Sequence, residues 1–202
     1  YTVTLNAPVT GSAVSVLLAN GQTVNIAVGA ASASVTAIAP DNVYGGGASV
    51  ANNIVSASGG NFENLTPSTA VVNTSVSDDG DITTASLSAT PTVVEGGSIV
   101  YTATLTSAAQ TPVTLTLSNG AVITIAAGAT SGTVTVAAPS DDPYIDAGNV
   151  STTISTATGG DFESLQIDPA AAVTAVGDDT DTTTVSLAAT PSVAEGGTIV
   201  YT

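Results

Sequence analysis

The stretch that decides the fold is ITTASLSATPTVVEGGSIVYT, residues 82–102, because it returns as TTTVSLAATPSVAEGGTIVYT, residues 182–202. The two copies agree at 15 of 21 positions and lie 100 residues apart. YTVTL at Tyr1 likewise returns as YTATL at Tyr101, and GGNFENL (59–65) returns as GGDFESL (159–165). Self-similarity at a fixed period identifies a chain of tandem structural units.

Within one repeat the residues alternate as they do in β-strands. VTLTL (113–117), VITI (122–125) and TVTV (133–136) place apolar or β-branched residues at every second position, and no helical periodicity occurs. The Ser-Asn-Gly triplet at 118–120 supplies a tight turn. The pattern predicts about seven strands, at roughly 84–94, 98–106, 112–118, 121–126, 132–138, 149–157 and 170–177. We therefore expect an all-β fold of tandem immunoglobulin-like β-sandwich repeats.

The repeat boundaries divide the chain into three parts. Residues 82–181 form a complete repeat, residues 1–81 form a repeat that lacks its first strand, and residues 182–202 begin a third. We expect the missing strand to belong to sequence upstream of Tyr1. The segment after Thr182 is a candidate to fill the open edge of a neighbouring molecule, which would exchange strands between copies of the chain.

The composition excludes several classes of function. The 202 residues include sixteen acidic residues and no Lys, Arg or His, for a formal net charge of −16. Such a surface repels phosphate backbones and anionic lipids, so neither nucleic-acid binding nor membrane-surface binding is expected. Aromatic residues make up only 3%, too few for a platform that stacks sugars or bases. There is no Cys, hence no disulfide, and no apolar run is long enough to insert into a membrane.

The order of the strands predicts that the acidic residues gather at one end of the sandwich. In a seven-strand antiparallel sandwich the connections after strands one, three and five, and the exit from strand seven, share one pole. In the second repeat these connections carry seven acids: Glu95, Asp141, Asp142, Asp146, Asp178, Asp179 and Asp181.

Carboxylates gathered in this way need a cation or must splay into water. Two unit charges about 4 Å apart repel by roughly 1 kcal/mol in water and about 4 kcal/mol at an effective dielectric of 20. No basic residue exists to compensate them. Ca²⁺ takes six to eight oxygen ligands and is the favoured ion, Mg²⁺ remains an alternative, and Zn²⁺ would want His or Cys. The competing interpretation is that these Asp residues are turn formers and solubility devices.

The first repeat carries a reduced version of the same acidic set. Its counterparts are Asp41, Asp78, Asp79 and Asp81, and Glu195 begins the set of the third repeat. Asn42 and Gly46 stand where the second repeat has Asp142 and Asp146, so we expect a weaker site or fewer ions there. Asp161 and Glu163 fall at the opposite pole, where we favour a solvated loop over a second ion that bridges two repeats.

TPSVAEGGTIVYT, ITIAAGATSGTVTV and DDTDTTTVSL resemble the extender repeats of giant bacterial RTX-type adhesins, which include Lap-type biofilm adhesins and the ice-binding adhesins of marine bacteria. The resemblance spans the whole chain. The layout is also similar to Calx-beta domains, and this similarity implies calcium binding at the seven acids named above, with the Tyr144 carbonyl as a further ligand. Unlike those domains, the chain has no acid in the hairpin at 118–120.

The resemblance implies a stalk that projects from the bacterial cell surface into the extracellular space, in which neighbouring repeats of the same chain are the partners. Our leading hypothesis is thus a calcium-rigidified structural extender of an adhesin for cell adhesion and biofilm formation. The alternative is a binding module that contacts ice, glycan or a surface polymer through exposed strand faces or loops. An enzyme is not expected, because only carboxylates could catalyse and no aromatic cleft accompanies them.

Overall fold

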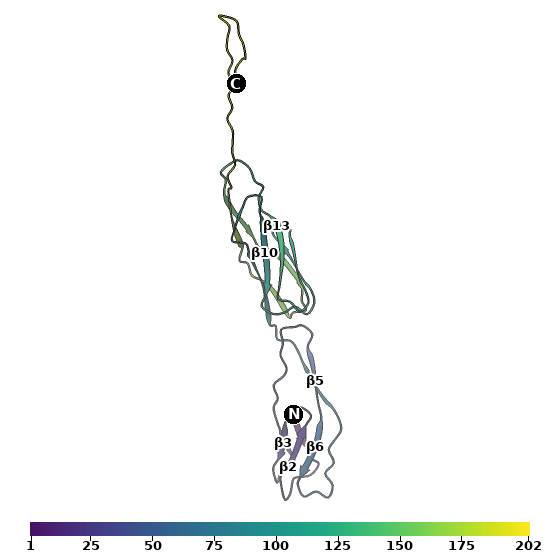
Figure 1. The fold of residues 1–202 in the computed structure, drawn as a ribbon. Coiled ribbons are helices and arrows are strands. Elements are labelled where there is room, and N and C mark those ends of the chain that lie inside the picture. The colour runs from purple at the N-terminus through teal and green to yellow at the C-terminus, as the bar shows by residue number, and fades with distance from the viewer. The chain divides into compact units, whose positions relative to one another are not determined.

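The computed structural model describes residues 1–202 and is built entirely of β-strands, which confirms the predicted fold class. The chain forms two compact units (Figure 1). One comprises Tyr1–Thr83 together with Asp161–Ser164, and the other comprises Thr84–Gly160 together with Leu165–Thr202. We describe each unit by itself. The structure contains no helix that is long and apolar enough to cross a membrane.

The second repeat contains ten strands: β8 (Ile82–Ala89), β9 (Thr92–Val94), β10 (Ser98–Leu105), β11 (Val113–Leu117), β12 (Val122–Ile125), β13 (Ser131–Ala137), β14 (Gly148–Thr152), β15 (Ile154–Gly159), β16 (Ser164–Ile167) and β17 (Ala172–Gly177). They form three sheets, in the orders β13-β10-β8-β16, β12-β11-β15 and β14-β17-β9. All the pairings with a determined register are antiparallel except that of β17 with β9, which is parallel.

The core of this unit follows from the period-two alternation. Every second residue of β10 is buried, from Ile99 to Leu105, and β11 and β12 bury their apolar positions in the same way. The largest fully buried side chain is Tyr101, which is 1% exposed. Its hydroxyl lies 2.9 Å from the hydroxyl of Thr152 on β14, so its polar atom has a partner in the core.

Three details differ from the predicted strands. The predicted strand 84–94 is divided into β8 and β9 around Pro91, and the predicted strand 149–157 is divided into β14 and β15 at Thr153. In each case the chain moves from one sheet to another at the break, which a continuing alternation of residues does not reveal. The short β16 was predicted as loop. Seven expected strands thereby become ten.

The first unit contains β1 (Thr2–Thr4), β2 (Val14–Leu18), β3 (Thr23–Ile26), β4 (Ser32–Ser34), β5 (Ala48–Asn52), β6 (Ile54–Gly59) and β7 (Val72–Val76). Their sheets are β1-β4, β3-β2-β6 and β5-β7. In Figure 1, β2, β3 and β6 lie side by side. The core centres on Val9, Val14, Val16, Val24 and Ile26. In this unit no strand pairs with β1 as β8 pairs with β10, and no strand pairs with β7 as β9 pairs with β17.

Candidate metal centre

The parallel pairing of β9 with β17 places two acidic residues side by side at one pole of the second unit. In this register Gly177 lies opposite Val94, and the next residues along each strand are Asp178 and Glu95. The amide of Glu95 donates a hydrogen bond of 3.1 Å to the carbonyl of Gly177, which fixes the backbone at this point. The loop after β13 reaches the same pole and supplies three more aspartates, Asp141, Asp142 and Asp146.

Two clusters of carboxylates result. In each, ligand oxygens from three residues all lie within 4.8 Å of one another. The first cluster is Glu95, Asp146 and Asp178, and the second is Asp141, Asp179 and Asp181. The structure thus brings together six of the seven acids predicted for this pole, and each cluster combines residues from separate loops. Acidic clusters of this kind could hold metal ions through hard oxygen ligands.

Glu95 is the one acid in these clusters that is buried, with 9% of its surface exposed. Asp146 and the backbone of Asp142 lie beside its carboxylate, and Oε2 is buried without any hydrogen-bond partner. Burial raises the pKa of Glu95 above its ordinary value of 4.5, and the neighbouring Asp146 raises it further. A buried carboxylate oxygen without a partner is costly, and a cation coordinated there would satisfy it.

The second cluster is more exposed, and repulsion dominates it. The charges of Asp179 and Asp181 raise the pKa of Asp141 above its ordinary value of 3.8, ahead of any effect of burial. Gly96, in the turn between β9 and β10, lies close to Asp141 in the loop after β13. Its φ is +67°, which favours glycine, and a Cβ at this position would lie only 3.4 Å from the Cβ of Asp141. A shared cation is the simplest means of relieving this repulsion.

Asp142 and Tyr144 have a different local role from the clustered acids. The Oδ1 atom of Asp142 accepts a hydrogen bond of 2.9 Å from the amide of Tyr144, which closes a turn within the loop. Asp142 is therefore outside both clusters, although its backbone contacts the Glu95 carboxylate. The Tyr144 side chain is 72% exposed. Metal ligation by the Tyr144 carbonyl stays a prediction.

The pole of the first unit has a single cluster, formed by Asp41, Asp79 and Asp81. Asp78, the counterpart of Asp178, accepts hydrogen bonds of 2.8 Å from the amides of Gly46 and Gly47. Asp178 accepts a single backbone hydrogen bond, of 3.1 Å, from the amide of Asp146, and it also joins a carboxylate cluster. Burial raises the pKa of Asp81 above 3.8, and its neighbours Asp79, Asp41 and Glu163 raise it further.

Glu195, the remaining predicted ligand, lies in the exposed segment after Thr182 and belongs to no cluster. Its counterpart Glu95 is buried at the end of β9, whereas the residues around Glu195 form no strand.

Glu163 is a functional candidate that the sequence analysis assigned to a solvated loop. In the first compact unit its Oε2 atom accepts hydrogen bonds from the amides of Gly80 (2.8 Å) and Asp81 (2.7 Å). The adjacent Phe162 stacks on Tyr44, with ring centroids 5.8 Å apart and planes inclined by 21°. The recurrence of GGxFExL in both repeats was the signal for this role, because a merely solvated loop has no need of the same Phe and Glu.

The fold and the acidic poles define a class of all-β repeat modules without basic residues. Residues 1–79 and 81–180 each match the family model described as the LapA domain, so the chain belongs to that family. The family is that of Lap-type adhesins, cell-surface proteins of adhesion and biofilm formation, and it points to a non-enzymatic structural protein. No curated protein and no solved structure matches the chain.

Proposed function

We propose that the chain is a calcium-binding extender of a Lap-type adhesin, in which bound ions stiffen the junction that follows each sandwich. The observation that carries the proposal is Glu95, a buried carboxylate whose Oε2 has no partner and which adjoins Asp146 and Asp178. Asp178, Asp179 and Asp181 belong to the chain that leaves β17, so an ion held by both clusters would fix the φ and ψ angles of this exit.

The donor set favours calcium over other ions. Carboxylates and backbone carbonyls are hard oxygen ligands, and several can be collected around an ion that accepts six to eight of them. A smaller Mg²⁺ keeps most of its waters and uses fewer protein ligands. The proposed ligands are Glu95, Asp146 and Asp178 in one cluster, Asp141, Asp179 and Asp181 in the other, and Asp142 and Tyr144 through the loop between them. The first repeat would hold an ion with Asp41, Asp79 and Asp81.

Stiffening is energetically plausible at such a junction. Ordering the backbone of a residue costs about 1–2 kcal/mol, and the exit from β17 contains few residues before the next repeat begins. A ligand that binds only the folded state at a hundred times its Kd stabilises it by about 2.7 kcal/mol. Calcium can therefore offset the ordering of this exit while it neutralises the repulsion among the carboxylates. We propose that the stalk is exposed at the bacterial cell surface, where it projects a ligand-binding region of the adhesin.

A thermal unfolding experiment tests the proposal. The chain is unfolded in excess EDTA, in millimolar Ca²⁺ and in millimolar Mg²⁺, and circular dichroism records the melting temperature. We expect calcium to raise it by about 10 °C or more and magnesium to raise it much less. Glu95→Gln should remove most of the calcium effect on the second repeat. The matched control is Glu63→Gln, which removes an exposed acid outside every cluster.

Equal melting temperatures in calcium and EDTA would contradict calcium binding, and the acids would then be turn residues on a charged surface. A calcium effect that Glu95→Gln and Glu63→Gln reduce equally would instead indicate diffuse screening of charge.

The alternative, a binding module, is favoured by one feature of the second repeat. Thr114 on β11 lies opposite Thr124 on β12 and Thr158 on β15, so three exposed threonines form a row across this sheet. Such a row could contact ice, a glycan or a surface polymer.

A further inference from the structure

The first compact unit contains a piece of the second repeat. Residues 161–164, which follow β15, group with Tyr1–Thr83 and not with the rest of their own repeat. An antiparallel bridge pairs Phe162 with Tyr44, in the loop between β4 and β5. Two backbone hydrogen bonds form this bridge: one of 2.9 Å from Gly45 to Asp161, and one of 3.0 Å from Glu163 to Val43. Residues 161–164 thus dock on the first unit as a very short strand.

Side chains strengthen this contact. The Phe162 ring stacks on that of Tyr44. The Oε2 atom of Glu163 accepts hydrogen bonds from the amides of Gly80 and Asp81, in the linker that follows β7. Both amides donate to the same oxygen, and hydrogen bonds to a carboxylate are roughly twice as strong as those between neutral groups. The docked segment therefore holds the linker as well as the loop.

Glycine at position 80 explains how the linker can bind a carboxylate. Gly80 has a φ of +97°, in the region that favours glycine, and no atom lies within 4 Å of the place where its Cβ would be. A backbone that turns through positive φ aims successive N–H groups at one anion. The linker of the second repeat has Thr180 at this position. The first linker is thus suited to Glu163 by its sequence.

The docked segment also has a conformation of its own. GGNFENL and GGDFESL differ only at their third and sixth positions, yet Asp161 has a φ of +56° and Asn61 does not have a positive φ. Asp161 is the one non-glycine residue of the chain in this region. Such a conformation costs free energy and persists where contacts compensate it. Here the Asp161 carbonyl accepts the hydrogen bond from Gly45.

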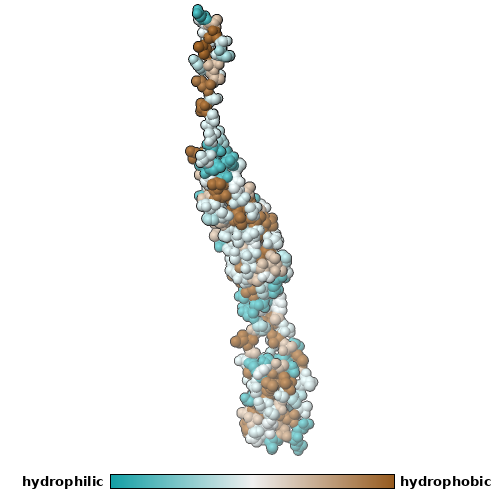
Figure 2. All heavy atoms as spheres, viewed as in Figure 1, coloured by the Kyte–Doolittle hydropathy of each residue, from teal (hydrophilic) through white to brown (hydrophobic).

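Electrostatic repulsion opposes the contact. Figure 2 shows hydrophilic residues gathered at the pole of the second unit, where the segment after Thr182 begins. At the pole of the first unit, Glu163 approaches acids of the same charge and helps to raise the pKa of Asp81. The chain has no Lys, Arg or His that would compensate it. Glu163 is held there by backbone amides, which are neutral donors.

We propose that Glu163 is a positioning residue that latches the linker of the first repeat without any metal ion. Its carboxylate fixes the backbone at Gly80 and Asp81, and the linker then holds Asp79 and Asp81 beside Asp41. The partner that this surface recognises is the docking segment of the following repeat, residues 161–164. The latch does not depend on calcium binding, so all of its tests are made in EDTA.

Hydrogen exchange of single amides, followed by NMR, tests the latch. In the unsubstituted chain the amides of Gly80 and Asp81 should exchange at least about tenfold more slowly than in an unstructured chain. Glu163→Ala should abolish this protection, while the amides of β2 and β11 stay protected and show that both units are folded. Glu163→Gln keeps one oxygen that can accept both hydrogen bonds, so it should retain part of the protection. Glu163→Asp is one methylene shorter and should behave like Glu163→Ala.

The matched control is Glu63→Ala, which removes the exposed glutamate at the same position of the first repeat. It should leave the exchange of Gly80 and Asp81 unchanged. The proposal is overturned if these amides are unprotected in the unsubstituted chain, or if their protection survives Glu163→Ala. Equal effects of Glu63→Ala and Glu163→Ala would also overturn it, because net charge alone would then control the linker.

A glycine substitution tests the same latch from the linker. Gly80→Ala strains a residue at φ +97°, and Gly21→Ala strains one at φ +81° that likewise has open space around it. Only Gly80→Ala should speed the exchange of the Asp81 amide. Equal exchange of this amide in the two variants would attribute the effect to a general loss of stability and would contradict the latch.

Engineered cysteines test the docking itself, because the chain has none of its own. Tyr44 and Phe162 are bridge partners, so Tyr44→Cys/Phe162→Cys should form a disulfide within one chain when it is oxidised at high dilution. The control, Tyr44→Cys/Phe62→Cys, uses the Phe that packs against the core of the first unit, and should give at least about tenfold less product. Equal yields, or a product that joins two chains, would overturn docking of the chain's own segment.

Discussion

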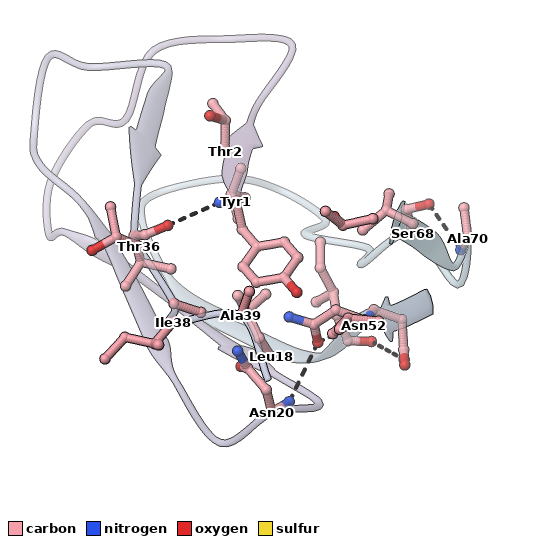
Figure 3. Close-up of a pocket in the computed structure, with 18 of the residues that line it drawn as sticks. Tyr1, Thr2, Leu18, Asn20, Thr36, Ile38, Ala39, Asn52, Ser68 and Ala70 are labelled. Carbon is pink, nitrogen blue, oxygen red and sulfur yellow. Dashed lines mark hydrogen bonds between the residues drawn. The ribbon is translucent and has the colours of Figure 1, made fainter. Parts of the chain in front are cut away.

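The two repeats share a sequence pattern and differ in how well one face is covered. In the second repeat Tyr101 is 1% exposed and its hydroxyl is paired with Thr152. Its counterpart Tyr1 is half-buried beside an open groove (Figure 3) and beside Asn52, whose Nδ2 has no hydrogen-bond partner. In the second repeat β8 and β9 cover this face, and no such pair of strands lies on the edges of the first unit. The core of this sandwich is therefore completed by its first strands, and without them the same residues line a groove.

The acidic poles differ for the same reason. The second repeat has two carboxylate clusters, one of which includes the buried Glu95 at the end of β9. The first repeat has one cluster, and its Asp78 is satisfied by the amides of Gly46 and Gly47. Glu95 follows directly after β9. The strand that covers this face of the sandwich therefore also places Glu95 in the acidic pole.

The largest expected effect is that of truncating the buried tyrosine. Tyr101→Ala should destabilise the second repeat by about 3–5 kcal/mol, because it leaves a large cavity and removes the partner of Thr152. Tyr1→Ala should destabilise the first repeat by about 1 kcal/mol or less, because its ring already borders open space. Denaturant unfolding gives the two free energies, and hydrogen exchange assigns each to its repeat.

Tyr101→Phe is the control for this pair. It keeps the ring and loses one hydrogen bond, which predicts a loss of about 1 kcal/mol. Equal losses for Tyr101→Ala and Tyr1→Ala would show that the groove is closed in solution, and the contrast between the repeats would not hold.

A second prediction concerns pH and is opposite in sign with and without calcium. The pKa values of Glu95 and Asp141 are raised above 4.5 and 3.8 in the folded chain. Between the ordinary and the raised values the folded state binds more protons than the unfolded state, so the free energy of unfolding falls as pH rises. This contribution is fully present below the ordinary values and is lost above the raised ones. In saturating calcium only the ionised carboxylates bind, and stability should rise with pH instead.

Urea unfolding between about pH 4 and about pH 7, in EDTA and in calcium, measures both slopes. Glu95→Gln should flatten both slopes for the second repeat, while Glu63→Gln should leave them unchanged. Slopes of the same sign in EDTA and in calcium would exclude these clusters as the site where the ion binds.

Sequence reasoning predicted that acidic residues gather at one pole. In an antiparallel sandwich every second connection lies at the same pole, so the pole of a loop follows from the number of strands before it. Sequence reasoning did not predict which acids meet. Asp142 and Asp78 are held by nearby backbone amides, and such local hydrogen bonds depend on loop conformations that alternation does not encode. The division at Thr153 was missed for a related reason. The β-pattern continues through the residue at which the chain crosses from β14 to β15.

A smaller effect is expected from making the first repeat more like the second. Asn42→Asp restores the paired aspartates of 141–142, and its Oδ1 can still accept the hydrogen bond from the Tyr44 amide. The added charge should raise the calcium affinity of the first repeat by roughly threefold, since ligand charge tunes such sites. Calorimetric titration measures the affinity. Asn61→Asp adds the same charge in the loop after β6 and should change nothing; an equal gain would indicate a general effect of charge.

The smallest expected effect tests whether the exposed threonine row has a function. Thr114→Val keeps the branched shape and removes one hydroxyl from the row of Thr124, Thr114 and Thr158, so stability should change by less than about 0.5 kcal/mol.

The first repeat already contradicts a continuous binding face, because Asn25, Ser15 and Ser58 occupy the equivalent row. A surface that recognises an ordered polymer or ice needs the same groups in successive repeats, and here the threonines change while the cluster of Asp141, Asp179 and Asp181 recurs as Asp41, Asp79 and Asp81. Retention on immobilised polysaccharide and thermal hysteresis at an ice surface should therefore be the same for Thr114→Val and the unsubstituted chain. If Thr114→Val lost retention on the polysaccharide or lost thermal hysteresis, the threonine row of the sheet would be the functional surface and not the acidic pole, because this substitution leaves every carboxylate in place.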